Sequence, residues 1–535
     1  MSSIKVQLPE NEQHELSELI GAAEDHARQH QYDMALRELN RALRYLEDKQ
    51  ANGVEEQRAL LRFARAELLM QLGRWEGALE DIDRIFAAED CLRGSQLLVR
   101  ALLASSQISA NYGDYNEAIA SLEKALALVH EHGGPVERAR VHLELGTIFS
   151  RIGELQQGIQ RLDSVLECIP EPPSGEDAAT VLAAAYTQKG LSAFRKGSHD
   201  EARAHYQKSL EILRQAAPKT RIEADTLRYL GILCSVEGRN AEALLYHRQA
   251  LVLYGLLRVS LGQAKTYNSI GQTCLDLSRL DEALHFMHKA ERLSRKLGAD
   301  AESAAIYGKL GNIYLQTGDY NRAVEYHLKD IDMCRRFGNY RALAYAMRNL
   351  GLSYRGKGDV EEALHYLGES LHRFEELQDR AHIARVHLDL GRTFLERGRL
   401  PEAEDHIELG LRSLEGSEQP GADLGRALAL MGALQRLCSN AEQAEAFLGR
   451  AVRQLQDFGP SADLARAHFE LGMLHLDHRH NDAAMDEMKQ CLALARELDL
   501  RELMLDSLQQ IERLDEFELV NLLVEDVRRK STSSG

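Results

Sequence analysis

Small residues recur along this chain at a constant spacing, and apolar residues flank them. Gly271, Gly311, Gly351 and Gly391 are 40 residues apart, and each is followed twelve residues later by an alanine. The first small residue of each unit, its anchor, is in order Ala23, Ala66, Ser106, Gly146, Gly190, Gly231, Gly271, Gly311, Gly351, Gly391, Gly432 and Gly472. The second is Ala35, Ala78, Ala118, Gly158, Ala202, Ala243, Ala283, Ala323, Ala363, Ala403, Ala444 and Ala484. A period this regular indicates a stack of twelve similar structural units.

The spacing within a unit predicts two antiparallel helices that cross at the small residues. The side chains at a crossing point set how closely two helices approach, so glycine or alanine there permits tight contact. Glycine inside a helix costs about 1 kcal/mol relative to alanine, and its repeated use therefore indicates a packing requirement.

Glycines and aspartates mark the turn between the two helices of a unit. The predicted turn glycines, which suit a left-handed helix C-cap, are Gly153, Gly197, Gly238, Gly318, Gly358 and Gly398. Asp319 and Asp359 follow two of them and are predicted to N-cap the next helix, because a carboxylate accepts hydrogen bonds from free amides.

The unit resembles the tetratricopeptide repeat (TPR). Leu310-Gly311, Tyr314 and Ala323 match the pattern of that family. The resemblance spans about residues 14 to 500, in the 40-residue form found in LGN/Pins-type adaptors and bacterial TPR regulators. It implies an all-α, right-handed superhelical α-solenoid of about twelve helix hairpins with a C-terminal capping helix.

Breaks in the pattern suggest a division of the array. The prolines of residues 170–177 cannot continue a helix, so we expect an N-terminal block at 1–170 and a main block at 178–499; continuous stacking through a longer loop is the alternative. Residues 500–530 are predicted to form capping and amphipathic helices, and 531–535 a disordered tail. The acidic amphipathic stretch from Asp515 either caps the array or occupies its groove, in the same molecule or through self-association.

Composition narrows the class of protein. The net charge is −18, which disfavours nucleic acid as a partner. No apolar run approaches the roughly 20 residues of a membrane span, and seven scattered cysteines fit a reducing compartment. We therefore expect a cytoplasmic protein without membrane insertion.

No sequence motif for catalysis or cofactor binding is recognisable, so we expect no enzyme activity, no cofactor and no metal. His475, His478 and His480 are the nearest candidate for a metal site, but ordinary turn and surface positions explain them equally well.

Basic side chains gather at the positions that TPR geometry directs into the concave groove. Those positions hold Asp225 as their only acid in units four to twelve, although the protein is acidic. The candidate groove residues are Arg228, Lys265, Asn268, Gln272, Asn312, Arg348, Asn349, Arg355, Arg385, Arg392, Arg426, Arg436 and Arg466, with Arg140 at the same register in the fourth unit.

Two interpretations of the arginines stay open at this point. They pair with nearby acids such as Glu144, Asp389, Glu396 and Glu470, or they bind an acidic protein segment through bidentate hydrogen bonds. Asn312, Asn349 and Arg385 also match part of a clamp by which some TPR proteins hold a chain-terminal carboxylate. Gly308 and Asp389 stand where that clamp needs basic residues, so the clamp is incomplete.

The function predicted from these features is a non-catalytic scaffold or adaptor that binds an extended or helical, acidic protein segment in its groove. The alternative is a sensory TPR regulator whose superhelix changes conformation when a small peptide or ligand binds.

Overall fold

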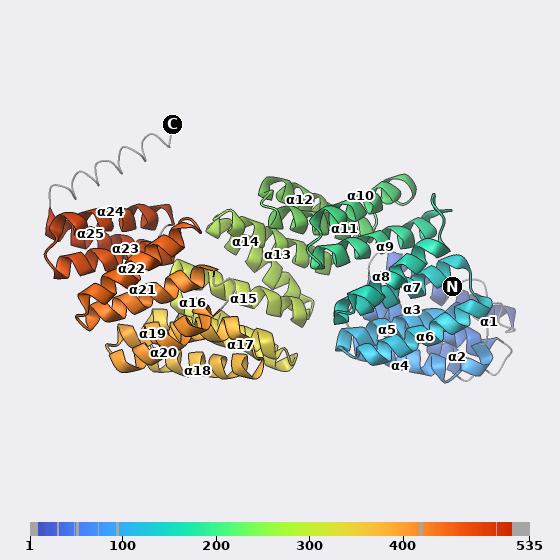
Figure 1. Cartoon of the computed structure of the whole chain (residues 1–535). Helices are drawn as coiled ribbons and strands as arrows, with labels where there is room; N and C mark the ends of the chain where they lie inside the picture. The colour runs from blue at the N-terminus through green and yellow to red at the C-terminus, as the bar shows by residue number, and fades with distance from the viewer. Residues whose placement is uncertain are drawn as a thin grey trace, which may run out of the picture. The chain divides into compact units, whose positions relative to one another are not determined.

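The computed structural model describes residues 9–28, 31–47, 49, 53–72, 74–92, 96–416, 421–498 and 500–515. These residues form α-helices, one short 3-10 turn at Glu89–Leu92 and no strand (Figure 1). The chain divides into two compact units, unit 1 ending at Ile306 and unit 2 beginning at Tyr307, inside α15.

The helices before this boundary are α1 (Glu10–Arg28), α2 (Tyr32–Glu47), α3 (Val54–Gln71), α4 (Trp75–Phe86), α5 (Gln96–Tyr112), α6 (Tyr115–His132), α7 (Pro135–Ile152), α8 (Leu155–Cys168), α9 (Glu176–Arg195), α10 (His199–Ala216), α11 (Arg221–Val236), α12 (Asn240–Leu256), α13 (Ser260–Asp276) and α14 (Leu280–Lys296). The remaining helices are α15 (Asp300–Thr317), α16 (Tyr320–Arg336), α17 (Tyr340–Lys357), α18 (Val360–Glu376), α19 (Arg380–Glu396), α20 (Leu400–Glu415), α21 (Gly421–Leu437), α22 (Ala441–Gln456), α23 (Ala462–Asp477), α24 (Asn481–Glu497) and α25 (Arg501–Leu514).

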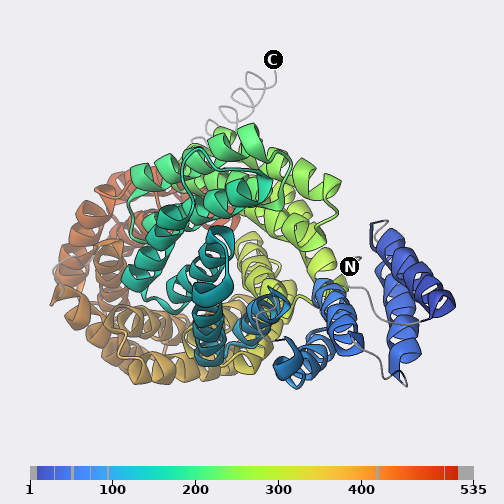
Figure 2. The same ribbon diagram turned by 90° about the vertical axis from the view of Figure 1, so that its right-hand side faces the viewer.

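The helices form the twelve predicted pairs, from α1/α2 to α23/α24. In each pair the anchor lies on the first helix and the second small residue on the second. The two helices of a pair pack side by side, and both ribbon views show the resulting stack of helices (Figure 1, Figure 2). The prediction of an all-α repeat solenoid is confirmed.

Contacts at the anchors explain why they are small. A Cβ added to Gly351 would lie 2.8 Å from Leu367 Cγ and 3.1 Å from the carbonyl oxygen of Ala363. A Cβ added to Gly391 would lie 2.6 Å from Ile407 Cγ1. A larger anchor would push the paired helices apart, which in packed cores costs about 1–3 kcal/mol.

The turn glycines adopt the predicted left-handed conformation. Gly358 has φ 91° and ends α17, and Gly318 has φ 79°. Asp319 caps α16 by accepting a hydrogen bond from the Arg322 amide. The same prediction is wrong for Asp359, whose side chain makes no cap and instead accepts a hydrogen bond from Lys357 Nζ at 2.6 Å.

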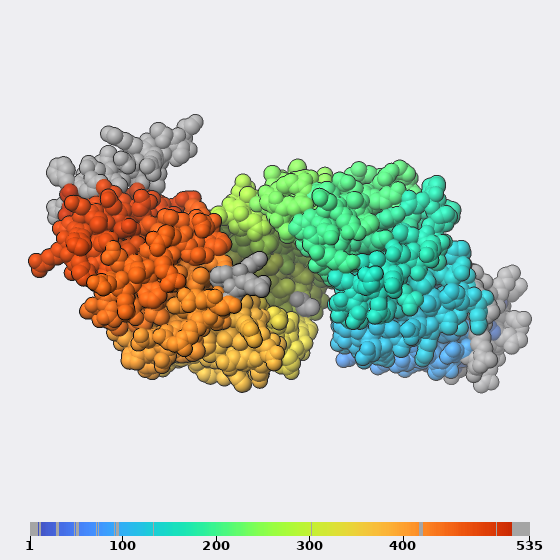
Figure 3. Space-filling model, in the orientation of Figure 1, coloured from blue at the N-terminus to red at the C-terminus, as the bar shows by residue number. Residues whose placement is uncertain are grey.

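Hydrophobic packing within unit 1 continues across the proline-rich loop. Leu162 and Ile169, which precede this loop, share a buried cluster with Ala179 and Leu182, which follow it. In unit 2 the colours of the described residues run in chain order over the visible surface, toward red (Figure 3). Each helix pair therefore gains its core from its neighbours, as expected of a repeat array; the predicted blocks at 1–170 and 178–499 stay predictions.

The C-terminal helix α25 packs on α24, as predicted for a capping helix. Leu503 and Ile511 are buried against Cys491 and Met488 respectively. The described residues end at Asp515. The rest of the predicted acidic amphipathic stretch and the predicted tail at 531–535 therefore lie outside them. Among the described helices, none has the length and apolar character to cross a bilayer.

Candidate functional site

The first helices of successive pairs lie next to one another and form one surface in each unit. In unit 2 this surface is built from α17, α19, α21 and α23, with consecutive members in contact. Asn349 Nδ2 of α17 donates a hydrogen bond of 3.0 Å to Asn312 Oδ1, which adds α15 to the series. We call this surface of unit 2 the first-helix face.

Asp389 stands at the centre of the first-helix face. Its carboxylate accepts a hydrogen bond from Arg348 Nε of α17 at 2.6 Å and another from Arg426 Nη2 of α21. The Asp389 side chain is 1% exposed, and those of Arg348 and Arg426 are 19% and 15% exposed. One carboxylate thus joins three consecutive helix pairs.

The charge state of Asp389 depends on these partners. Burial alone would raise its pKa, but the positive charges of Arg426, Arg348 and Arg355 lower the pKa to about 2. Asp389 is therefore ionised at neutral pH. Removing it would leave buried guanidinium groups unpaired, which is strongly unfavourable.

Other arginines of the set pair with acids of the next helix pair. Arg385 Nε donates a hydrogen bond of 2.7 Å to Asp423 Oδ2. Arg436 bonds Glu470 at 3.1 Å and Asp477 at 3.0 Å. The pairing predicted for Asp389, Glu396 and Glu470 is confirmed. Glu144 makes no ion pair with an arginine of the described residues and accepts a hydrogen bond from Gln107 at 3.1 Å.

The sequence contained a signal for the missed partners Asp423, Asp463 and Asp477. Each ion pair joins residues 34 to 41 positions apart, which is close to one repeat length. Searching for an acid one repeat from each arginine would have found these aspartates.

Two arginines share a single carboxylate at one place on this face, and a third arginine belongs to the same candidate set. Arg392 Nε donates to Glu396 Oε1 at 2.9 Å, while Arg355 Nε is 3.8 Å from Glu396 Oε2. Arg355 Nη1 is buried and has no hydrogen-bond partner in the described part of the chain. Arg466 of α23 makes no ion pair within 4.0 Å among the described residues.

Burial and neighbouring positive charges lower the pKa of two of these arginines. Burial lowers the pKa of Arg355 to about 10, and the charges of Arg392 and Arg426 add to that effect. Burial, followed by the charge of Arg392, also lowers the pKa of Arg466. An anion placed among these groups would relieve both effects. We call Arg355, Arg392 and Arg466 the arginine cluster.

The candidate carboxylate clamp is only partly assembled. Asn312 and Asn349 are brought together by their hydrogen bond, but the guanidinium of Arg385 is bonded to Asp423. Asp389 is the centre of the ion-pair network, which explains structurally why no basic residue occupies its position.

The candidate residues of unit 1 form a separate group. Arg228 is 8% exposed and its guanidinium carbon lies 4.3 Å from the Tyr229 ring centroid. Burial, followed by the charge of Arg228, lowers the pKa of Lys265. Asn268 donates to Glu302 at 3.0 Å and Gln272 to Asp276 at 3.1 Å.

Two other acids of unit 1 have partners of their own. Asp225 accepts a hydrogen bond of 2.5 Å from the Tyr254 hydroxyl. Arg140 pairs with the exposed Asp177 at 3.1 Å. Each unit thus has its own set of candidate residues.

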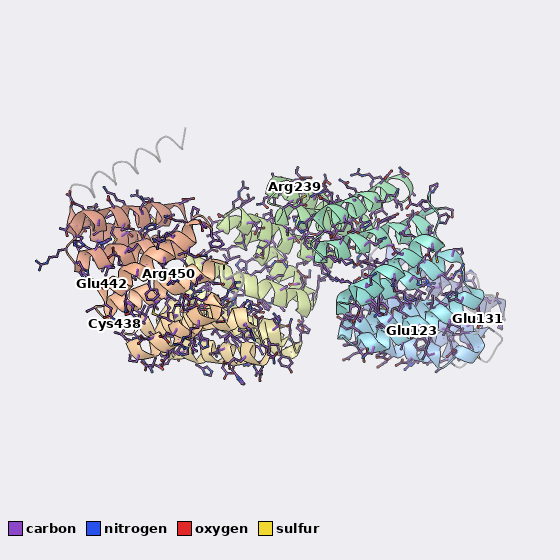
Figure 4. The ribbon with its side chains drawn as sticks, viewed as in Figure 1. Glu123, Glu131, Arg239, Cys438, Glu442 and Arg450 are labelled. Atoms are coloured by element: carbon purple, nitrogen blue, oxygen red, sulfur yellow. The ribbon has the colours of Figure 1, made fainter. Side chains whose placement is uncertain are left out.

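The surface hollows and the possible metal ligands are further candidates for a functional site. Two surface hollows lie between second helices, one lined by Tyr246 and Leu210 and the other by Phe447 and Arg450. Arg450, labelled in Figure 4, projects from α22 and pairs with Glu415 at 3.3 Å. Within the described ranges no three His, Cys, Asp or Glu side chains are grouped to hold a metal ion, and His475, His478 and His480 are no exception.

The fold and this surface define the class of protein: an all-α helical repeat solenoid. A tetratricopeptide repeat model matches residues 181–254, 262–336 and 340–415, and a second model of that description matches residues 99–128. A model of anaphase-promoting complex subunit 5 matches residues 436–509. The chain is a tetratricopeptide repeat protein.

One curated relative is the photosystem I assembly protein Ycf3 of Rippkaea orientalis (strain PCC 8801 / RF-1). It is 30% identical over 115 residues, which are 21% of this chain and 63% of the relative, so the chain spans less than two thirds of that protein's length.

Solved structures share the fold. The apo form of RapI is 12% identical with a TM-score of 0.55, covering 70% of this chain and 98% of that one. The apo form of the quorum sensor NprR from B. thuringiensis is 15% identical with a TM-score of 0.53, covering 69% and 99% respectively. Repeat arrays of this kind present extended surfaces for binding, which supports a role in protein interaction or regulation.

Proposed function

We propose that this chain is a non-catalytic adaptor whose first-helix face binds an acidic segment of a partner protein at the arginine cluster. The observation that carries the proposal is the buried Arg355 Nη1, which has no hydrogen-bond partner among the described residues. A buried charged donor without an acceptor costs free energy. A ligand carboxylate would supply that acceptor.

The rest of the network explains why the cluster is available for a ligand. Asp389 engages Arg348 and Arg426, and Asp423 engages Arg385, so these arginines serve the packing of neighbouring pairs. Arg355 and Arg392, by contrast, share the single carboxylate of Glu396 as their ion-pair partner among the described residues. The proposed binding residues are thus Arg355, Arg392 and Arg466, while the other arginines of unit 2 hold the face together.

The experiment selects ligands for the wild-type chain from an immobilised library of random twelve-residue peptides and then measures their affinity by fluorescence polarisation. We expect enrichment of Asp and Glu. The double variant R355Q/R392Q should bind the selected peptides about 10- to 100-fold more weakly, because hydrogen bonds to charged groups are worth about 1.5–3 kcal/mol.

The matched control is Arg450→Gln, which removes an arginine from the surface of the same unit, outside the first-helix face. It should leave affinity unchanged. Circular dichroism verifies that all variants fold. An equal loss in the control, or no acidic preference in the wild type, contradicts the proposal.

A sensory regulator is the second candidate, favoured by the fold shared with NprR, which is described as a quorum sensor. Small-angle X-ray scattering with and without a selected peptide separates the two functions. A sensor should change its radius of gyration on binding, whereas an adaptor should not.

A further inference from the structure

A gap interrupts the lining of the first-helix face at Gly308 of α15. Three residues before the anchor, several other pairs carry a longer side chain, such as Arg228, Asn268 or Arg348, and even the short Ala429 has a Cβ. Gly308 has none, and a Cβ built there would lie 2.7 Å from Asp330 Oδ2. The carboxylate of Asp330, on α16, therefore occupies the space that a residue 308 side chain would fill.

Asp330 is the unusual residue at its own register. Seven residues after the second small residue, neighbouring pairs carry small side chains, which the structure buries where two helices cross; they are Ala250, Ala290, Ser370, Gly410 and Ala451. An aspartate at this position adds a charge that packing of the helix pair does not require.

The Asp330 carboxylate lacks a cationic partner. It is half-buried, and its Oδ1 atom lies 3.6 Å from Cys334 Sγ. No Lys, Arg or His nitrogen lies within 4.0 Å of it in the described part of the chain. Burial raises its pKa to about 6, and no neighbouring positive charge opposes that rise.

We propose that Gly308 and Asp330 form a cation subsite, which binds a primary ammonium or guanidinium group of the segment held by the first-helix face. Glycine at 308 places no side chain against Oδ2, and the cation provides the counter-charge that Asp330 otherwise lacks. A carboxylate this enclosed is reached by a group at the end of a flexible arm, as in a lysine or arginine side chain. The subsite rests on the proposed function and extends it: the bound segment carries a basic residue as well as acidic ones.

The experiment uses the full chain and an octapeptide library, acetylated and amidated at its ends, with each position scanned in turn. The wild type should prefer Lys or Arg at one position, binding such peptides about 10-fold more tightly than their Gln counterparts. Asp330→Asn should abolish that preference. Asp330→Ser, which copies Ser370 of the next pair, provides a second variant should the first fail to fold.

Asp332→Asn is the matched control, because it removes an exposed acid from the same helix; the preference for Lys or Arg should persist. The same scan with free amino termini identifies the source of the cation: a preference for a free terminus that depends on Asp330 assigns the subsite to the chain end. If wild type and Asp330→Asn show the same preferences in both libraries, the subsite is wrong and Asp330 contacts only Cys334.

The library also separates this proposal from the adaptor function. Loss of the acidic preference in R355Q/R392Q is the result that the arginine cluster predicts. An acidic preference without any cation preference dependent on Asp330 rejects the subsite alone. A cation preference without an acidic one rejects the arginine cluster and retains the subsite.

Discussion

Asp389 and Asp330 are two shielded aspartates of unit 2 with opposite surroundings. Arg348 and Arg426 bond Asp389, and its pKa falls to about 2. Asp330 has no cation within reach among the described residues, and its pKa rises to about 6. Partners rather than burial decide whether an enclosed carboxylate is stable in its charged form.

The difference separates structural from functional charge on one surface. The ion pairs of Asp389 hold consecutive helix pairs together, and the guanidinium groups of Arg348 and Arg426 already donate to it. Among the described residues, Arg355 Nη1 has no hydrogen-bond partner and Asp330 has no cationic partner, and we propose these two groups as the places where a ligand binds. Perturbed, unpaired groups of this kind gather at functional sites.

Replacing Asp389 should produce the largest effect. In Asp389→Asn the buried guanidinium groups of Arg348 and Arg426 lose their counter-charge, which should cost about 3–5 kcal/mol of unfolding free energy. Urea denaturation followed by circular dichroism measures the loss. Asp332→Asn serves as the surface control and should stay within about 0.5 kcal/mol of wild type; a similarly small change in Asp389→Asn would contradict the structural role.

A buried histidine on α16, the helix that carries Asp330, should make the stability of unit 2 sensitive to acid. His327 is 0% exposed, and burial lowers its pKa to about 4 from the ordinary 6.5. Below pH 6.5 the unfolded chain takes up the proton first, so stability present above that pH is lost as pH falls toward 4. At pH 5 the loss should be about 2 kcal/mol.

His327→Leu tests this effect, because Leu367 fills the same position in the next pair. The stability difference between pH 7 and pH 5 should shrink by about 2 kcal/mol in the variant. The exposed His372, changed to Gln, is the control. An unchanged pH dependence in His327→Leu would show that the ring is not held neutral.

Asp330→Asn should stabilise the protein near neutral pH, the reverse of Asp389→Asn. The folded pKa of Asp330 lies above its ordinary 3.8, so its favourable contribution is complete below pH 3.8 and is lost as pH rises through 6. With allowance for partial solvent screening, the variant should gain about 1–2 kcal/mol at pH 8 and nothing at pH 3.5. Thermal denaturation at both pH values measures this, and equal gains at both would contradict the assignment.

The smallest effect should be the coupling between Gly308 and Asp330. Gly308→Ala gains about 1 kcal/mol of helix propensity, but the added Cβ conflicts with Asp330 Oδ2. The substitution should therefore stabilise the Asp330→Ala protein and not the wild type. A double-mutant cycle measures the coupling, and additive effects would show that the carboxylate does not fill the gap.

The fold was predictable because the anchors obey a spatial constraint in every unit. Gly351 and Gly391 are small for one reason, close helix crossing, so their spacing alone predicts the pairs. The turn glycines follow from backbone conformation in the same way. Asp359 escaped prediction because Lys357 competes for its carboxylate.

The site was less predictable because its charges pair between repeats. A single-unit pattern identified Arg348, Arg355 and Arg392, but it could not tell which arginines are satisfied. That distinction depends on Asp389, which lies one repeat away from Arg348. Asp330 was not predicted as a site residue because the sequence does not show that its carboxylate lies beside Gly308, on the other helix of the pair.

The most direct test of the proposed function is the affinity of Arg355→Gln for the acidic peptide that the wild type selects. We predict at least about 10-fold weaker binding with unchanged folding, because glutamine removes the guanidinium charge and the Nη1 donor that would hold a carboxylate. Wild-type affinity in this variant would contradict the claim and place the binding surface elsewhere on the chain.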